Sequence, residues 1–270
     1  ENLRPHPGQT TSAANMFAAL KGSEIVASHR QGDGVVQDAY SLRCSPQVAG
    51  AVRDTIEHAR LVASREIRAI IDNPVVLEDG EVTSNGNFHG APVAYVLDFL
   101  AIALADLGSI AERRTDRFLD ASRNRGLPPF LADDPGVDSG LMIAQYTQAA
   151  LVSENKRLAN PASVDSIPSS AMQEDHVSMA NFAARKLRTA VINAQRVIAI
   201  ELHAAAQGRE FNRTLRAGVG AQAAYEFIRK NVPPLKNDRY MTPELDRITA
   251  LVADGSIRIA VERQVGKLRE

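Results

Sequence analysis

The chain has 270 residues, 44% of them hydrophobic, which is enough to bury a large core in one domain or a continuous helical assembly. Its 31 basic and 32 acidic side chains nearly cancel, which excludes a strongly basic nucleic-acid-binding surface and gives no sign of attraction to an anionic membrane. We expect no membrane span, because we find no apolar run of the roughly 18 to 20 residues that cross a bilayer, and the single cysteine, Cys44, cannot form an internal disulfide. These features favour a cytoplasmic protein whose partner is a small molecule or another protein.

Helical periodicity dominates the first half of the chain. A first helix is predicted over residues 9–28, followed by a glycine-bearing loop at 31–34. The next helix, over residues 46–71, places its apolar side chains on one face and stops at Asp72-Asn73-Pro74. A turn-rich connector at 81–90 leads into a helix over 91–119. This last helix is apolar on several faces, so we expect other helices to surround it.

Long helices also account for the second half. A proline-rich loop at 126–136 precedes a predicted helix over 139–158, and a helix of about thirty residues follows position 180. Shorter helices are expected near 220–229, from Thr242 and after Gly255. The predicted fold class is therefore all-α, as a bundle of long helices. We predict one helical domain over residues 1–270, with the core bundle at about 1–207 and covering helices at about 208–270.

The stretch SIPSSAMQEDHVSMA, residues 166–180, concentrates polar side chains. One interpretation makes it the start of a helix, with Ser170 and Gln173 forming a capping box and Glu174 and Asp175 at the favourable end of the helix dipole. The other interpretation is chemical, because two carboxylates lie beside the imidazole of His176. These residues alone give the two interpretations equal weight.

A second polar group precedes the predicted helix at 46–71. Gln37, Tyr40 and Arg43 are spaced by three residues and share a face if the segment is helical. An arginine binds a carboxylate through two parallel hydrogen bonds, and glutamine and tyrosine can add further ones. The group suits an amino-acid carboxylate clamp, while pairing of Arg43 with a local acid and packing of Tyr40 is the structural alternative.

A third candidate is SNGNFHG, residues 84–90, where flanking glycines could present Phe88 to a ligand ring or leave it as a loop anchor. We expect no metal site, since the sequence has no HExxH or CxxC pair, and no phosphate-binding glycine loop. The remaining histidines, including His203, are expected at the surface or hydrogen-bonded.

Taken together, these stretches are similar to the histidine ammonia-lyases of the aromatic amino acid lyase family. The similarity rests on four strings in the family's order: VQDAYSLRCSPQV, GNFHGAPVA, LPPF continuing through SGLMIAQYTQAALVSENK, and SVDSIPSSAMQEDHVSM. It covers nearly the whole chain and weakens beyond Gly208. The resemblance implies a helical bundle of the aspartase and fumarase type, and a homotetramer whose pockets draw residues from several subunits.

The activity implied by the resemblance is deamination of L-histidine to trans-urocanate and ammonia. The family's electrophile is 4-methylidene-imidazol-5-one (MIO), which forms from an Ala-Ser-Gly tripeptide of the backbone. This sequence has no Ala-Ser-Gly, and its nearest string is Asp138-Ser139-Gly140. The chain is therefore expected to be the C-terminal helical part of the enzyme, with no cofactor-binding residue of its own and inactive without the N-terminal MIO-bearing part.

The resemblance also implies roles for single residues. Arg43 corresponds to the carboxylate anchor, with Gln37 and Tyr40 lining the pocket; Tyr40 would orient the substrate or the developing anion, because the family's base lies in the N-terminal part. Phe88 corresponds to the phenylalanine beside the substrate ring, and Glu174 to the glutamate near the imidazole. Phenylalanine-directed relatives have Asn-Gln-Asp where this chain has Gln-Glu-Asp at 173–175. A carboxylate can accept a hydrogen bond from an imidazole but gains nothing from a phenyl ring.

Two alternatives remain open from the sequence. One is an ammonia-lyase or aminomutase of the same family that acts on phenylalanine or tyrosine. The other is a relative without catalytic activity that serves as a helical scaffold or regulator, for which the missing tripeptide is the only support.

Overall fold

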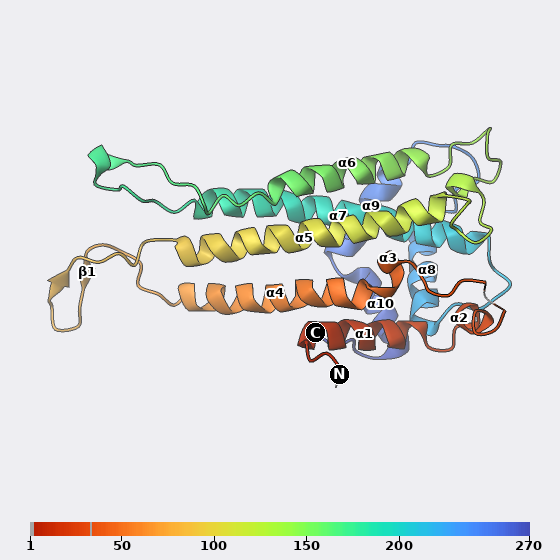
Figure 1. The fold of residues 1–270 in the computed structure, drawn as a ribbon, viewed down its shortest axis with the longest axis horizontal. Coiled ribbons are helices and arrows are strands. Elements are labelled where there is room, and N and C mark those ends of the chain that lie inside the picture. Colours follow the sequence, from red (N-terminus) through yellow and green to blue (C-terminus); the bar gives the residue numbers. More distant parts are fainter. Residues whose placement is uncertain (1–2, 33) are drawn as a thin grey trace.

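The computed structural model describes residues 3–32 and 34–270, and its regular structure is mostly helical (Figure 1). The all-α prediction is confirmed. The α-helices are α1 (Pro7–Leu20), α2 (Glu24–Ser28), α3 (Tyr40–Arg43), α4 (Ser45–Glu66), α5 (Ala91–Leu119), α6 (Met142–Leu158), α7 (Ala180–Glu210), α8 (Val219–Asn231), α9 (Thr242–Ala253) and α10 (Ser256–Val265). Two 3-10 turns, η1 (Pro129–Leu131) and η2 (Ser170–Met172), and the antiparallel strands β1 (Val75–Val76) and β2 (Val82–Thr83) complete the described elements.

The long helices α4, α5, α6 and α7 run side by side along the length of the molecule (Figure 1). Helix α5 packs against the other three, and its buried positions include Ala94, Ala101, Ala105 and Ala111. Such small side chains allow neighbouring helix axes to approach closely. Helix α1 packs on α4 where Gly50 faces the backbone of Gln9, and a Cβ at position 50 would lie only 2.4 Å from that backbone. The bundle therefore owes its tight packing to short residues.

The C-terminal helices α8, α9 and α10 cover the second half of α7. Their shared core contains the buried side chains Ala199, Ala206, Ile228, Val232, Ile248, Leu251 and Ile257. The division of the domain at about residue 207 stays a prediction. Helix α7 continues to Glu210, and it contributes to this core as well as to a second one, in which Ile200 and Ala204 pack with Leu119, Leu131 and Leu141.

Three predicted helices differ from the observed ones. The first is two helices, because the chain turns after α1 at Gly22, which has a positive φ of 73°. The second ends at Glu66, before the predicted limit of 71. The predicted helix start at Ser170 is wrong: η2 is a single turn in which Ser170, Ala171 and Met172 have φ of 50°, 54° and 71°. The left-handed region cannot continue into an α-helix, so α7 begins only at Ala180.

The expectation that no segment could span a membrane is also corrected. Helix α5 is long and apolar enough to do so by length and composition alone, although 33% of its most apolar stretch is already buried within this chain. Its contacts with α4, α6 and α7 account for the buried part of this stretch, and the rest, including Tyr95, Phe99 and Ile102, is exposed in this chain.

His203, on α7, departs from the expectation for the histidines. Its side chain is completely buried, and neither ring nitrogen has a hydrogen-bond partner among the described residues. Burial, with the nearby positive charges of Arg229 and Arg239, lowers its pKa to about 4. The imidazole is therefore neutral at physiological pH and acts as part of the core.

A buried ion pair joins α5 to α7 next to the start of the loop that carries Glu174. The Lys186 ammonium lies 2.7 Å from Asp98 Oδ1, and it also donates to the carbonyl of Asn160. The backbone N–H of Ser163 donates to Asp98 Oδ2 at 2.7 Å. Both charged side chains are at least nine-tenths buried. The pair thus fixes the start of the loop to the ends of two helices.

Replacing Lys186 by methionine is expected to lower the free energy of unfolding by about 3–5 kcal/mol, because the Asp98 carboxylate would stay buried without its cation. Burial raises the pKa of Asp98, but the hydrogen bonds from Lys186 and Ser163 outweigh it and the net pKa is lowered. A lowered pKa stabilises the fold above the unfolded value of about 3.9, so this contribution should disappear as the pH falls below about 4. Urea unfolding at pH 7 and at lower pH measures both effects.

The double variant Asp98→Asn/Lys186→Met is the control, since it removes both charges and should recover part of the loss. Arg60→Met removes one partner of the exposed pair of Glu57 and Arg60 and should change stability little. Equal losses in the Lys186 and Arg60 variants would contradict the importance of the buried pair.

Candidate functional site

Two long loops project from the same end of the bundle, on the left in Figure 1: the connector between α4 and α5, and the loop between α6 and α7. Where they meet they form a cleft of about 410 Å³. Phe88 lines it from the connector, and Gln173, Glu174, Asp175 and His176 line it from the other loop. The structure thus brings together two of the predicted site residues, Phe88 and Glu174, which are 86 positions apart in the sequence.

Direct contacts hold the two loops together. His89 Nε2 lies 3.1 Å from the carbonyl oxygen of His176, and the two imidazoles stack with ring centroids 5.6 Å apart. Next to them, Gly90 lies so close to the Ser178 side chain that an added Cβ would come within 2.9 Å of its hydroxyl oxygen. These contacts fix Phe88 relative to the loop that carries Glu174.

Glu174 is held in a short backbone pairing with Ser169. The Ser169 N–H donates to the carbonyl of Glu174 at 2.9 Å, and the Ser169 hydroxyl donates to the Glu174 carboxylate at 2.5 Å. The predicted capping box of Ser170 and Gln173 is absent, because no helix begins at these residues. The Glu174 side chain is exposed on the cleft, and Phe88 is 55% exposed. The carboxylate and the ring are thus both accessible to a ligand.

The predicted carboxylate clamp lies on and before α3. The Arg43 guanidinium lies 4.5 Å from the centre of the Tyr40 ring, so these two side chains share a face as predicted. Gln37 lies outside the helix, and all three residues are exposed. Arg43 lines a cleft of about 630 Å³ between α1, α3, α4 and α5, together with Asp38, Arg53 and Arg114.

The two groups of predicted residues are far apart within one chain. Arg43 precedes the first residue of α4, and Phe88 lies in the connector beyond its last. Figure 1 shows α3 and this connector at opposite ends of α4. The 22 residues of α4 span roughly 33 Å at 1.5 Å per residue. A free amino acid bound to this chain is too small to contact both the clamp at Arg43 and the cleft at Glu174.

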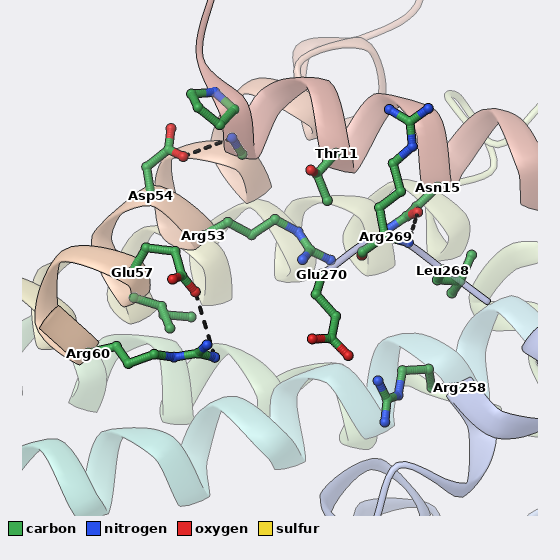
Figure 2. A pocket seen from close by; sticks show the side chains of 13 residues that line it. Thr11, Asn15, Arg53, Asp54, Glu57, Arg60, Arg258, Leu268, Arg269 and Glu270 are labelled. Carbon is green, nitrogen blue, oxygen red and sulfur yellow. Dashed lines mark hydrogen bonds and ion pairs between the residues drawn. The ribbon is translucent and has the colours of Figure 1, made fainter. Parts of the chain in front are cut away.

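A further cleft of about 470 Å³ lies between α1, α4 and the C-terminal segment (Figure 2). Its side chains carry opposite charges, including Arg53, Glu57, Arg60 and Arg258. None of the predicted site residues lines it. Within residues 3–32 and 34–270, no group of three or more His, Cys, Asp or Glu side chains is arranged to hold a metal ion.

The sequence matches the family of aromatic amino acid lyases over residues 1–230. The chain belongs to this family. It is 65% identical over 267 residues to the histidine ammonia-lyase of Streptomyces avermitilis. This match covers 98% of this chain and 52% of that protein. The chain spans about half the length of the curated relatives it matches.

Solved structures of the family have the same fold. The histidine ammonia-lyase of Trypanosoma cruzi matches with a TM-score of 0.87 and 42% identity, over 97% of this chain and 49% of that one. Tyrosine aminomutase from Streptomyces globisporus matches with a TM-score of 0.89 and 39% identity, over 99% of this chain and 54% of that one. The fold is therefore shared by proteins whose names indicate different reactions.

Membership of the aromatic amino acid lyases implies the MIO group. The residues of this chain do not fit its formation, because the tripeptide Ala-Ser-Gly does not occur among the 270 residues.

Sequence reasoning missed the residues that contact the segment around the clamp. Arg114 of α5 donates to the carbonyl of Ser41 and to the hydroxyl of Ser45, and it pairs with Glu201 of α7. The available signal was the charged run at 112–114, which ends an otherwise apolar helical pattern. The partner of Arg114 is 87 residues away in the sequence, and no local pattern indicates it.

Proposed function

We propose that this chain is the substrate-holding half of a histidine ammonia-lyase, which converts L-histidine to trans-urocanate and ammonia and which needs the MIO-bearing part for activity. The observation that carries the proposal is the cleft that Glu174 and Phe88 line together. The identity of 65% to a histidine ammonia-lyase supports the same substrate.

In this proposal Glu174 recognises the imidazole. An imidazole N–H donates a hydrogen bond to a carboxylate, and the carboxylate also stabilises an imidazolium. The hydroxyl of Ser169 already donates to one Glu174 oxygen, Oε2, and so leaves the other available for a ligand. Phe88 would contact the flat face of the ring.

Arg43 is proposed to bind the substrate carboxylate, and Gln37 and Tyr40 to line the pocket beside it. Since α4 separates this clamp from Glu174 by roughly 33 Å, we propose that each complete pocket combines residues of different subunits in a homotetramer. Large apolar side chains that lie exposed on the long helices fit such an assembly, among them Tyr95, Phe99, Ile102 and Phe182.

The reaction requires removal of a weakly acidic proton from the carbon next to the ring, and departure of the amine. MIO would supply the electrophile from the part of the enzyme outside this chain. The residues here would bind the carboxylate at one end and the imidazole at the other, which holds the proton near its base. Such orientation can contribute up to about 7–11 kcal/mol to catalysis. We also propose a cytoplasmic location, in keeping with a single cysteine.

The test is to express the complete protein and to incubate it separately with L-histidine, L-phenylalanine and L-tyrosine. Urocanate should form from histidine much faster than cinnamate or coumarate forms from the other two. A β-amino acid as the main product would favour an aminomutase, the second candidate, which the similarity to tyrosine aminomutase supports. Absence of any product would favour the scaffold alternative.

A further inference from the structure

Helix α3, which carries Tyr40 and Arg43, cannot fix its own orientation. It has four residues and none of them is buried. Its turn is closed by backbone hydrogen bonds from Arg43 N to Ala39 O at 3.0 Å and from Cys44 N to Tyr40 O at 2.9 Å. A single helical turn is unstable in water without packing, so contacts with the bundle must hold it.

Arg114 of α5 provides such a contact. Its Nη1 donates to the carbonyl oxygen of Ser41 at 3.3 Å and to the hydroxyl of Ser45 at 3.2 Å. The Ser45 hydroxyl in turn donates to the same Ser41 carbonyl at 2.9 Å. One guanidinium therefore binds α3 and the first residue of α4 together.

Arg114 is itself held rigidly by Glu201 of α7. Its Nε donates to Glu201 Oε1 and its Nη2 to Oε2, at 2.9 Å for the second, which is the paired geometry that arginine and a carboxylate prefer. The two side chains are only 18% and 16% exposed, so water screens the pair weakly. Helices α5 and α7 pack along each other, and this pair thus ties α3 to the centre of the bundle.

We infer that Arg114 and Glu201 are positioning residues for the carboxylate clamp: they orient α3 so that Arg43 presents its guanidinium to the substrate. This inference rests on the proposed function. Arg114 lines the same cleft as Arg43, but in this inference it acts through its hydrogen bonds to Ser41, Ser45 and Glu201 and not by touching the substrate.

Arg114→Lys in the complete enzyme tests the inference. Lysine keeps the positive charge beside Glu201 but has one ammonium in place of the planar fork, so it cannot bind Glu201 and α3 together in the same way. We expect the KM for L-histidine to rise roughly tenfold, as for the loss of one charge-assisted hydrogen bond in positioning, with a smaller change in kcat. Ser45→Ala removes the hydroxyl that accepts from Arg114 and donates to the Ser41 carbonyl, but it leaves the direct bond from Arg114 to Ser41, and it should raise the KM only a few-fold.

The decisive measurement is a double-mutant cycle with Arg43→Ala. If Arg114 acts through Arg43, then Arg114→Lys should lower kcat/KM much less in the Arg43→Ala background than in the unmutated enzyme. The matched control is Arg229→Lys, which alters another buried pair, with Glu210, away from α3, and should leave the KM unchanged.

Two results would overturn the inference. One is that Arg114→Lys lowers kcat/KM by the same factor with and without Arg43→Ala, and the other is that Arg114→Lys leaves the KM unchanged. Thermal unfolding of each variant shows whether the fold is retained. If the unmutated enzyme makes no urocanate from L-histidine, the proposed function fails, and this outcome is distinct from a failed cycle in an active enzyme.

Discussion

Arg43→Ala in the complete enzyme is expected to lower kcat/KM for L-histidine by roughly 100-fold, with most of the change in KM. The guanidinium would bind the substrate carboxylate through charge-assisted hydrogen bonds, and losing such bonds costs about 1.5–3 kcal/mol. A smaller drop in kcat should accompany it, because a substrate held only at its imidazole end positions its proton less well. Steady-state measurement of urocanate formation gives both parameters.

Two variants make this result specific. Arg43→Lys keeps the charge without the paired hydrogen bonds and should give an intermediate KM. Arg53→Ala removes an arginine that lines the same cleft from α4, and it should change kcat/KM only slightly. Near-normal kinetics in Arg43→Ala would remove Arg43 from the role of carboxylate anchor.

Helical periodicity predicted the bundle well because burial on one or several faces leaves a repeat in the sequence. The predicted limits of the helix at 91–119 coincide with those of α5. The loops were less predictable. Ser170 and Gln173 have the right residue types for a capping box, but the pairing of Ser169 with Glu174 and the left-handed backbone at 170–172 replace the helix start. Local residue types do not show whether a helix starts at Ser170 or Ser169 pairs with Glu174.

The residues of the candidate site could be named from the sequence, but their arrangement could not. The similarity to a family identifies Arg43, Phe88 and Glu174 without stating which of them belong to one pocket. Only the structure shows that the length of α4 separates Arg43 from Glu174. The supporting ion pairs could not be predicted from the sequence either, because each one joins residues of two different helices: Arg114 pairs with Glu201, and Lys186 with Asp98.

Glu174→Gln is the substitution expected to affect substrate choice most. Glutamine has nearly the same size and can still accept a hydrogen bond, but it cannot stabilise positive charge on the imidazole. We expect kcat/KM for L-histidine to fall about 10- to 100-fold, as for the loss of a hydrogen bond to a charged group. Any turnover of L-phenylalanine should fall less or rise, because a phenyl ring gains nothing from the carboxylate and burying that charge against it costs free energy.

The ratio of the two kcat/KM values is the quantity that tests imidazole recognition, because a general loss of structure would lower both values together. Glu174→Asp separates charge from position: it keeps the carboxylate but shortens its reach from the loop at 169–174, so a partial loss for histidine is expected. Ser169→Ala removes the hydroxyl that donates to Glu174 at 2.5 Å and should have a weaker effect of the same kind. Equal losses for histidine and phenylalanine in Glu174→Gln would mean that Glu174 supports the loop and does not select the substrate ring.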